Sequence, residues 1–238
     1  MRKVIVTGGS RGIGAACVAA FRENGDAVAF IYRESDEKAA EITEKTGAVH
    51  FKYDLKNYNN SVKAISAAQR ALGGCDVLVC AAGIDRIAQI CDTTEEDWNS
   101  IIGVNLTSVF AAVRTVSPGM IRGKSGRIIT LGSVWGARGA SCEVAYSASK
   151  AGLRGLTMAL GKELGPSGIT VNCIEPGVID TDMNACLDGE TRRELADSIA
   201  LGRFGSPSEI ARVVLFLASE KASYINGACI PVDGGFVG

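Results

Sequence analysis

The feature that most constrains the fold of this chain is a regular alternation of short apolar runs with segments of helical periodicity. The apolar runs cover residues 3–7, 27–32, 49–53, 76–80, 127–131, 169–174 and 229–232. The helical segments between them cover residues 11–24, 35–46, 59–72, 94–122, 145–164 and 207–219. Short continuous apolar runs are typical of parallel strands buried on both faces. The sequence therefore predicts a doubly wound, seven-stranded parallel sheet with helices on both faces, whose ligands bind at the carboxyl ends of the strands.

Length and charge narrow the class of protein further. The 238 residues suffice for one α/β core, and because no linker-like stretch divides them we expect a single domain over residues 1–238. With 25 basic and 26 acidic residues the net charge is -1, which argues against a nucleic-acid partner. The apolar run near the N-terminus is too short for a signal peptide or a membrane span, so we expect a cytoplasmic protein.

Cysteine and histidine usage argues against two other kinds of site. The eight cysteines include no CxxC pair, which disfavours a structural zinc site or a redox dithiol, and we expect no metal. Buried reduced thiols are the expected state of these cysteines. His50 is the only histidine, so a Ser-His-Asp hydrolase would depend on it alone.

A glycine-rich segment, TGGSRGIG at residues 7–14, follows the first predicted strand and opens the first predicted helix. Backbone N–H groups and the helix dipole favour a pyrophosphate at such a position. Gly8, Gly12 and Gly14 keep that approach free of Cβ atoms. The position and spacing indicate a dinucleotide site rather than a merely tight turn.

The end of the second predicted strand bears on the choice between NAD and NADP. An acidic side chain there would accept a hydrogen bond from the ribose 2′-hydroxyl and repel a 2′-phosphate. This chain has Tyr32 and Arg33 instead, and Arg11 could face the same phosphate, so we predict NADP(H). Glu34 is the neighbour that argues against this assignment. Asp54, at the end of the third predicted strand, is placed either to accept from the adenine amino group or to cap a helix.

A tyrosine and a lysine lie four residues apart near the start of a predicted helix. Tyr146 and Lys150 therefore project from one helix face, where the cation would lower the pKa of the phenol and fit it for proton exchange. Ser133 follows the fifth predicted strand, where its hydroxyl could orient a substrate carbonyl. Asn105 has apolar neighbours, and its amide could hold a water that leads to Lys150.

These motifs together resemble the short-chain dehydrogenase/reductase family over essentially the whole chain. The resemblance is carried by TGGSRGIG at 7–14, VNL at 104–106, Ser133, YSASK at 146–150 and EPGVIDTDM at 175–183. Within the family the chain looks most similar to 3-oxoacyl-[acyl-carrier-protein] reductases of fatty acid biosynthesis, through GRII at 126–129, GRFGSPSEIA at 202–211 and VDGG at 232–235. The resemblance implies a Rossmann-type fold and a carbonyl reductase that oxidises NADPH.

The resemblance also implies a role for each matching residue. Tyr146 would be the general acid in reduction, Lys150 would acidify it and grip the nicotinamide ribose, Ser133 would polarise the carbonyl, and Asn105 would anchor a proton-relay water. The implied coenzyme contacts are Gly8, Ser10, Arg11, Gly12, Ile13, Gly14, Arg33, Asp54, Leu55, Ala82, Gly83, Tyr146, Lys150, Pro176, Gly177, Ile179 and Thr181. The family also implies a homotetramer or homodimer formed through the helices at 94–122 and 145–164.

Two departures from the family pattern bear on these expectations. The segment Cys80-Ala81-Ala82-Gly83 stands where the family usually has Asn-Asn-Ala-Gly or Asn-Ala-Ala-Gly. Loss of the asparagine amides predicts a looser fourth strand. Ser167 stands where carrier-dependent reductases often have arginine, although Lys124 keeps a charge at the other docking position, so an acyl carrier protein is only one possible partner.

Two alternatives stay open for the function. The stretch 133–144 also resembles reductases that act on the 5-aminopentanone modification of elongation factor P, in which case Trp135, Cys142 and Glu143 would line the substrate mouth instead of packing within loops. The alternative from another class is a non-catalytic NADP(H)-sensing module, because the fold alone does not fix function. Such modules commonly lack the tyrosine or the lysine, and this chain has both.

Overall fold

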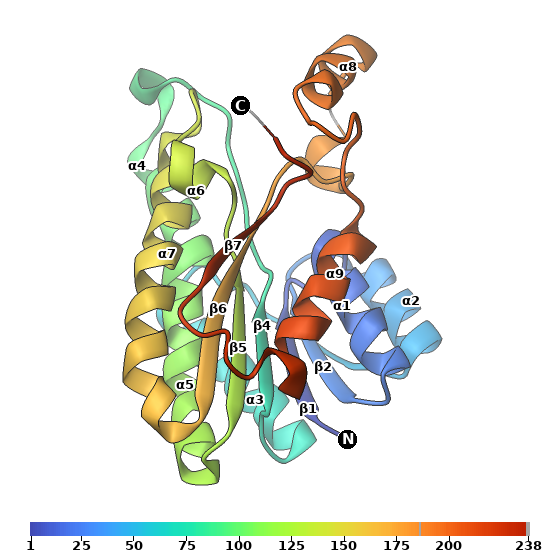
Figure 1. The fold of residues 1–238 in the computed structure, drawn as a ribbon, viewed down its shortest axis with the longest axis vertical. Coiled ribbons are helices and arrows are strands. Elements are labelled where there is room, and N and C mark those ends of the chain that lie inside the picture. Colours follow the sequence, from blue (N-terminus) through green and yellow to red (C-terminus); the bar gives the residue numbers. More distant parts are fainter. Residues whose placement is uncertain (186, 237–238) are drawn as a thin grey trace.

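The seven predicted strands form one parallel sheet, which lies between two layers of helices (Figure 1). This is a computed structural model, and it describes residues 1–185 and 187–236. The strand order is β3-β2-β1-β4-β5-β6-β7, and every neighbouring pair is parallel. The strands are β1 (Lys3–Thr7), β2 (Ala27–Tyr32), β3 (Val49–Lys52), β4 (Val77–Cys80), β5 (Gly126–Leu131), β6 (Ile169–Pro176) and β7 (Cys229–Val232). The predicted doubly wound fold is confirmed.

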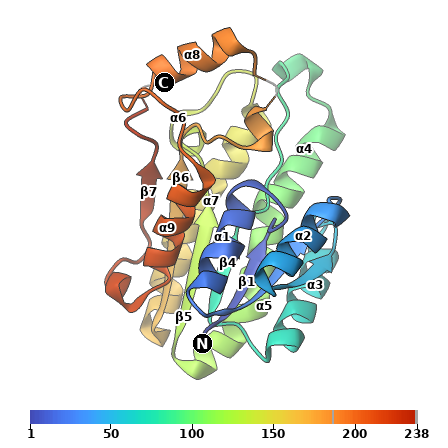
Figure 2. The ribbon, with the colours of Figure 1, turned by 90° about the vertical axis from the view of Figure 1, so that its right-hand side faces the viewer.

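The helices divide between the two faces of the sheet, as Figures 1 and 2 show from two sides. On one face lie α1 (Gly12–Glu23), α2 (Asp36–Thr46) and α9 (Pro207–Leu217). On the other lie α3 (Tyr58–Leu72), α4 (Glu95–Ile102), α5 (Ser108–Gly123) and α7 (Val144–Leu164). Two further helices, α6 (Trp135–Arg138) and α8 (Gly189–Asp197), lie beyond the carboxyl ends of the strands.

Alternate residues of β1 pack in two separate cores, one on each face of the sheet. Val4 and Val6 of β1 pack in the core beneath α1 and α9, whereas Ile5 packs in the core beneath α3, α5 and α7. All three side chains are 0% exposed. Burial on both faces is the reason that β1 reads as a continuous apolar run in the sequence.

The single helix predicted over 94–122 is interrupted in the structure. A π-helical turn, Gly103–Thr107, separates α4 from α5, and it contains the buried Asn105. Periodicity alone does not reveal one wider turn within a helical stretch. The whole stretch, Glu95–Gly123, is long and apolar enough to pass for a membrane span, but 56% of its most apolar window is buried within the protein, as in a core helix.

Two helices were not predicted from the sequence, α6 and α8. Neither contains a fully buried residue, so neither carries the apolar stripe on which a prediction from periodicity depends. The edge strands β3 and β7 also differ from the expectation of fully buried strands, since their residues are half-buried or exposed. Each pairs with only one neighbouring strand.

The cysteines are reduced where the structure describes them, but they are not uniformly buried. Cys17, Cys80 and Cys173 are buried, Cys75, Cys142 and Cys229 are half-buried, and Cys91 is exposed. Cys186 lies outside the described residues. The expectation of buried thiols is therefore wrong for Cys91, which lies in a short 3-10 turn at the protein surface.

Candidate active site

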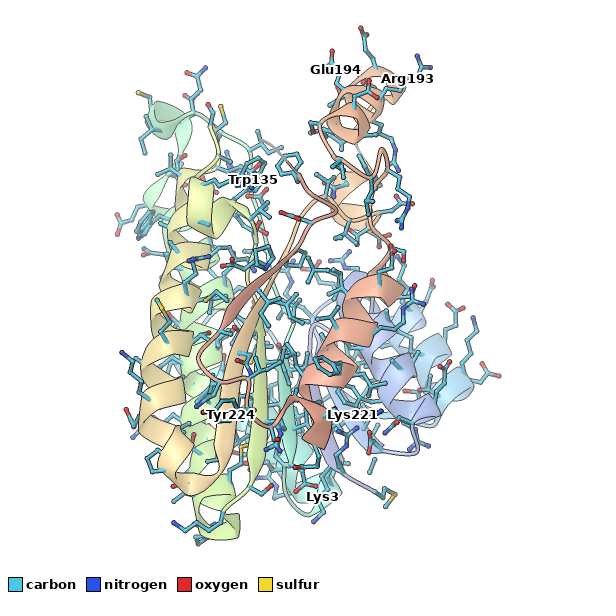
Figure 3. All side chains as sticks on the ribbon, in the orientation of Figure 1. Lys3, Trp135, Arg193, Glu194, Lys221 and Tyr224 are labelled. Atoms are coloured by element: carbon cyan, nitrogen blue, oxygen red, sulfur yellow. The ribbon has the colours of Figure 1, made fainter. Side chains whose placement is uncertain are left out.

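A cavity of about 570 Å³ opens at the carboxyl ends of the central strands. All the residues expected to contact the coenzyme line this cavity, and so does Ser133. Asn105 lies behind the wall, 0% exposed. In Figure 3, Trp135 marks the end of the molecule where the cavity lies, and Lys3, Lys221 and Tyr224 mark the opposite end. The fold thus brings together residues from position 8 to position 181 of the chain.

The glycine-rich turn between β1 and α1 is packed too closely for side chains. A Cβ on Gly14 would lie 2.1 Å from the carbonyl oxygen of Gly8, and a Cβ on Gly8 would lie 2.7 Å from the Cα of Ala82. Gly8 and Gly12 also have φ angles of 71° and 54°, in the left-handed region that favours glycine. These glycines hold the turn against the loop after β4 as well as leaving the cavity open.

The first turn of α1 is suited to bind an anion. Arg11 is the N-cap, and its side chain makes no capping hydrogen bond. The N–H groups of the first turn therefore keep their capacity to donate, and the helix dipole adds a partial positive charge. A cradle lined by glycine, with free backbone donors at a helix N-terminus, fits the pyrophosphate of a dinucleotide.

The end of β2 carries an ion pair rather than an isolated arginine. The guanidinium Nε of Arg33 lies 2.8 Å from a carboxylate oxygen of Glu34, and both side chains are solvent-exposed. Tyr32 donates a hydrogen bond from its hydroxyl to Asp36, 2.8 Å away. Because Lys52 also pairs with Asp36, the Asp36 carboxylate is already occupied, which reduces its repulsion of a phosphate at this edge.

Asp54 lines the cavity but does not cap a helix. Its carboxylate accepts a hydrogen bond from the backbone N–H of Lys56 at 2.9 Å, and Asn57 is the N-cap of α3. Of the two roles expected for Asp54, the structure therefore excludes the helix cap. A carboxylate held in this way at the cavity wall can still accept from an adenine amino group.

The side chains of Ser133 and Tyr146 lie close enough together that Ser133 lowers the pKa of the Tyr146 phenol. Ser133 follows β5 and is 7% exposed, and Tyr146 lies in the first turn of α7. The Ser133 hydroxyl also accepts from the backbone N–H of Trp135 at 3.2 Å, which fixes its position. Two adjacent hydroxyls at the cavity wall can both donate to one carbonyl oxygen.

The Lys150 side chain reaches the same point from one helical turn further along α7. Its ammonium nitrogen lies 5.3 Å from the centre of the Tyr146 ring and donates to the Leu131 carbonyl oxygen at 2.7 Å. Burial lowers the pKa of Lys150 to about 8. Lys150 therefore changes its charge close to neutral pH.

The expected lowering of the Tyr146 pKa is not found. Burial raises the pKa of Tyr146, and this effect exceeds the lowering by Ser133, while the negative charges of Asp85 and Glu143 add smaller increases. The physical reason is that Lys150 lies against the ring, with its hydrogen bond made to Leu131. The phenol is thus protonated at neutral pH, which is the form that a proton donor needs.

Asn105 contacts the loop after β4 rather than the cavity. Its amide oxygen accepts from the Ile84 N–H at 2.9 Å, and its amide nitrogen donates to the Ile84 carbonyl at 2.9 Å and to the Ser149 hydroxyl at 3.1 Å. A Cβ on Gly83 would lie 3.6 Å from both the Asn105 amide oxygen and the Lys150 nitrogen. The side chain of Asn105 therefore braces this loop, next to Lys150.

The end of β6 and the segment after it close one side of the cavity. Pro176, Gly177, Ile179 and Thr181 all line it. Gly177 passes so close to the C-terminal segment that a Cβ would lie 2.7 Å from that of Asp233. Ile179 is 5% exposed and packs into the core, so it holds this segment against the sheet.

A pair of carboxyl groups lies at the cavity wall, of which Asp85 was not predicted as a site residue and Glu143 was predicted only as part of the substrate mouth in one alternative. Asp85 lines the cavity, and its side chain is hydrogen-bonded to that of Glu143. Burial and the negative charge of Asp85 raise the pKa of Glu143 to about 7. The two residues are 58 positions apart in the sequence, and no motif links them. Only the tertiary contact reveals the pair.

The other residues considered for the substrate mouth pack within loops. The Trp135 ring meets the Phe236 ring edge-on at 5.4 Å. The carbonyl oxygen of Cys142 accepts from the Ala88 N–H at 2.8 Å. Within the described part of the chain, the cavity lining includes neither of them, nor Glu143, which reaches the cavity only through Asp85.

The replacement of asparagine by Cys80-Ala81 does not loosen the fourth strand. β4 pairs along all its residues with β1 and β5, and Cys80 is 2% exposed. The backbone N–H of Ala82 donates to the Thr7 hydroxyl at 3.2 Å, which holds the loop after β4. The expectation of a looser strand is wrong because the strand is held by its neighbours on both sides.

Comparisons with known proteins agree with this geometry. A family model described as enoyl-(acyl carrier protein) reductase matches residues 8–237. The chain is 42% identical over 235 residues to an acetoacetyl-CoA reductase of Rhizobium meliloti (strain 1021), a match that covers 98% of each protein. It is 41% identical over 239 residues to a 3-oxoacyl-[acyl-carrier-protein] reductase of Chlamydia muridarum, covering 98% of this chain and 96% of the relative.

Solved structures of the same kind superpose over almost the whole chain. A blue fluorescent protein from a metagenomic library, in complex with NADPH, is 35% identical with a TM-score of 0.93, covering 99% of this chain and 97% of that one. A short-chain dehydrogenase/reductase of Serratia marcescens is 36% identical with a TM-score of 0.92, covering 98% and 96%. From the family match, the relatives and the cavity geometry together, the chain belongs to the short-chain dehydrogenase/reductase family and is an oxidoreductase with a nicotinamide cofactor.

Proposed function

We propose that this enzyme uses NADPH to reduce a 3-oxoacyl thioester to the 3-hydroxyacyl thioester. The observation that carries the proposal is the adjacent pair of hydroxyls, Ser133 and Tyr146, at the wall of a cavity that fits a dinucleotide. The relatives named acetoacetyl-CoA reductase and 3-oxoacyl-[acyl-carrier-protein] reductase support this substrate class.

The residues of this chain would share the work as follows. Ser133 donates a hydrogen bond to the substrate carbonyl oxygen and orients it. Bound NADPH supplies the hydride to the carbonyl carbon. Tyr146 donates its phenolic proton to the oxygen, so that a secondary alcohol forms. Lys150 would hold the nicotinamide ribose and keep a positive charge beside the phenol. This positive charge stabilises the negative charge that develops on Tyr146 as it gives up its proton.

Asn105 is assigned a positioning role in this proposal. Its amide ties α4 and α5 to the loop after β4, through Ile84, and to α7, through Ser149. The side-chain amide of Asn105 is already hydrogen-bonded to Ile84 and Ser149. The expected relay water would therefore have to be held by the backbone of Asn105 or by neighbouring groups. Loss of the amide would shift the loop that faces the coenzyme.

The preference for NADPH rests on the charges around the end of β2. Arg11 and Arg33 line the cavity there, and the solved relative in complex with NADPH supports the assignment. Glu34 opposes it, since the Arg33–Glu34 pair has to open before Arg33 can bind a 2′-phosphate. A charge-assisted hydrogen bond of about 1.5–3 kcal/mol exceeds the value of an exposed ion pair, which is about 0–1 kcal/mol. Replacing the Arg33–Glu34 ion pair by a hydrogen bond from Arg33 to the 2′-phosphate is therefore favourable.

The proposed enzyme is a cytoplasmic homotetramer or homodimer in which residues 1–238 form one domain. Its subunits would pair through the exposed groove of Leu106, Phe110, Gly152, Leu156 and Ala159 on α5, α7 and the turn between α4 and α5. Phe110 is 48% exposed, although it is large and apolar. Apolar side chains that are exposed in one subunit are buried when two such helix faces pack together.

The experiment that tests the proposal is the oxidation of NADPH with acetoacetyl-CoA, in wild type and in Tyr146→Phe. We expect turnover in the wild type and a loss of about 10²- to 10⁴-fold in the variant, with NADPH binding retained. The same assay with the thioester of an acyl carrier protein tests whether a carrier is preferred. Coenzyme binding without reduction of any carbonyl compound would instead favour a non-catalytic NADP(H)-sensing module.

A second candidate substrate is an amino ketone, such as the 5-aminopentanone group on elongation factor P. The observation that favours it is the Asp85–Glu143 carboxyl pair beside Tyr146, since a carboxylate pair attracts an ammonium group. Comparing kcat/KM for an amino ketone and for the ketone that lacks the amine distinguishes this candidate. A preference for the uncharged ketone would exclude it.

A further inference from the structure

Two thiols face each other across the last two strands of the sheet, outside the cavity. Cys173 of β6 and Cys229 of β7 are direct register partners in the parallel ladder. Neighbouring strands lie about 4.7–4.9 Å apart, which falls within the range of about 4.4–6.8 Å between the Cα atoms of a disulfide. The two sulfur atoms and a carboxylate oxygen of Glu175 all lie within 4.8 Å of one another. The backbone is therefore already placed for a disulfide.

The two thiols differ in exposure and in charge. Cys173 is 0% exposed, whereas Cys229 is half-buried on the edge strand, where a small solute can reach it. The Cys173 thiol donates to the Ile174 carbonyl oxygen at 3.6 Å. The interaction with Cys173 and the nearby Arg154 guanidinium lower the pKa of Cys229 to about 7, against the opposite effects of burial and of the Glu175 charge. The interaction with Cys229 and burial raise the pKa of Cys173. Cys229 is therefore the thiolate of the pair and Cys173 the thiol.

The surroundings of the other buried thiols are different. Burial raises the pKa of Cys17 and of Cys80 to about 12. Cys80 interacts with the Cys75 thiol, but burial raises the pKa of both well above the ordinary value, so neither of them is a thiolate at neutral pH. A thiolate at neutral pH with a second sulfur beside it is thus a property of the Cys173–Cys229 pair.

We propose that Cys173 and Cys229 form an oxidation site, at which a hydroperoxide converts the pair into a disulfide between β6 and β7. In the first step the Cys229 thiolate attacks the peroxide, so that an S–O bond forms and the O–O bond breaks. The electron pair of sulfur reduces the peroxide, and the alkoxide or hydroxide that leaves takes up a proton from water. In the second step the Cys173 sulfur attacks the sulfenic acid of Cys229. The S–S bond forms, the S–O bond breaks, and the hydroxide leaves as water with the thiol proton.

The same three side chains, Cys173, Cys229 and Glu175, have the composition of a metal site, but their charges oppose a cation. Glu175 is ion-paired with Arg154 inside the protein, and its side chain is only 3% exposed. Lys150 is close enough to Cys173 to interact with it electrostatically. A divalent cation would have to displace Arg154 and lie near a second positive charge, whereas a disulfide needs neither change.

The thiol pair lies under the loop that carries Ser133. A Cβ on Gly132 would lie 2.7 Å from the Cys173 sulfur, and Gly132 donates its N–H to the Ile174 carbonyl at 2.7 Å. The oxidation site is therefore in contact with the active-site loop while remaining outside the cavity. It does not depend on which carbonyl substrate the enzyme reduces.

The test treats the folded enzyme with hydrogen peroxide, blocks free thiols with N-ethylmaleimide and identifies linked peptides by mass spectrometry. We expect a Cys173–Cys229 peptide that dithiothreitol separates, and we expect its loss in Cys229→Ala. Cys91→Ala is the matched control, because it removes an exposed thiol elsewhere and should leave the link intact. Coenzyme binding and the thermal midpoint show that each variant is folded.

A trapping experiment separates the roles of the two sulfurs. Cys173→Ser keeps a hydrogen-bond donor beside Cys229 but removes the second sulfur, so dimedone should capture a sulfenic acid at Cys229. In Cys229→Ser, dimedone should leave Cys173 unlabelled. Absence of the linked peptide, labelling of Cys173 instead of Cys229, or a bound zinc ion that protects both thiols from peroxide would each overturn the proposal.

Discussion

The Lys150 ammonium group lies against the face of the Tyr146 ring, with its nitrogen 5.3 Å from the ring centre. Its hydrogen bond goes to the Leu131 carbonyl oxygen, and burial is the largest influence on the pKa values of both residues. Burial lowers the pKa of Lys150 to about 8 and raises the pKa of Tyr146. The pair thus consists of a protonated phenol and a lysine that titrates slightly above neutral pH.

This relationship predicts the pH dependence of reduction. As the pH rises through about 8, Lys150 loses its proton and its charge, while Tyr146 stays protonated because its pKa is higher. We therefore expect kcat/KM for reduction to be constant below that pH and to fall about tenfold per pH unit above it. Initial rates at saturating NADPH would measure this. A profile that remains flat well above pH 8 would contradict the role given to Lys150.

The Asp85–Glu143 pair predicts a second pH effect, on substrate charge. Burial raises the pKa of Glu143 to about 7, so the pair gains its second negative charge as the pH rises through that value. If the substrate is an amino ketone, its KM should fall over the same range, and Glu143→Gln should abolish this fall. The matched ketone without an amine should show neither change. Equal pH profiles for both ketones would exclude recognition of a cation by the pair.

The same pair has a consequence for stability. Because the folded-state pKa of Glu143 is above its ordinary value of 4.5, folding favours the protonated form. The unfolded chain releases this proton at lower pH, so the stability of the wild type should decline relative to Glu143→Gln between about pH 4.5 and 7. Thermal midpoints of the two proteins across this range measure the difference. A constant difference would show that Glu143 titrates normally.

The choice of coenzyme should depend on Arg33 and Glu34. We expect Arg33→Ala to weaken NADPH binding by about ten- to a hundredfold and to change NADH binding little, because only NADPH carries the 2′-phosphate. Glu34→Gln should strengthen NADPH binding, since it frees Arg33 from its ion pair. Arg70→Ala, an exposed change on α3, serves as the control. Equal losses for both coenzymes would show that Arg33 does not read the phosphate.

Two glycines should respond oppositely to alanine. In Gly14→Ala the new Cβ would lie 2.1 Å from the Gly8 carbonyl oxygen, so we expect a loss of about 1–3 kcal/mol in stability together with weaker NADPH binding. In Gly119→Ala the Cβ would meet nothing within 4 Å on the exposed side of α5, so a gain of about 0.5–1 kcal/mol is expected. Thermal unfolding at one protein concentration measures both. A tolerated Gly14→Ala would mean that the turn can relax.

The exposed groove on α5 and α7 predicts where the subunits meet. Phe110→Glu places a charge in this groove, and we expect it to dissociate the oligomer into monomers in size-exclusion chromatography with light scattering. Val49→Glu is the control, because Val49 is similarly exposed on the edge strand β3, at 47%. An oligomer that survives Phe110→Glu and dissociates with the control would place the interface elsewhere.

The sequence by itself determined the fold and most of the cavity wall. Strands buried on both faces must be continuously apolar, and a tight turn against a neighbouring loop must use residues such as Gly8 and Gly14, so both features are visible as local patterns. The expected coenzyme residues line one cavity because parallel strands end at the same edge of the sheet. The four-residue spacing of Tyr146 and Lys150 likewise determined that they share a helix face.

Only the tertiary structure decided how these groups interact. The protonation of Tyr146 depends on its burial, which the spacing to Lys150 does not reveal. The Asp85–Glu143 contact and the Cys173–Cys229 pair join residues far apart in the chain, and they depend on loop packing and strand register. Local patterns record which face of an element is buried, whereas desolvation and long-range contacts arise only when the elements are packed together.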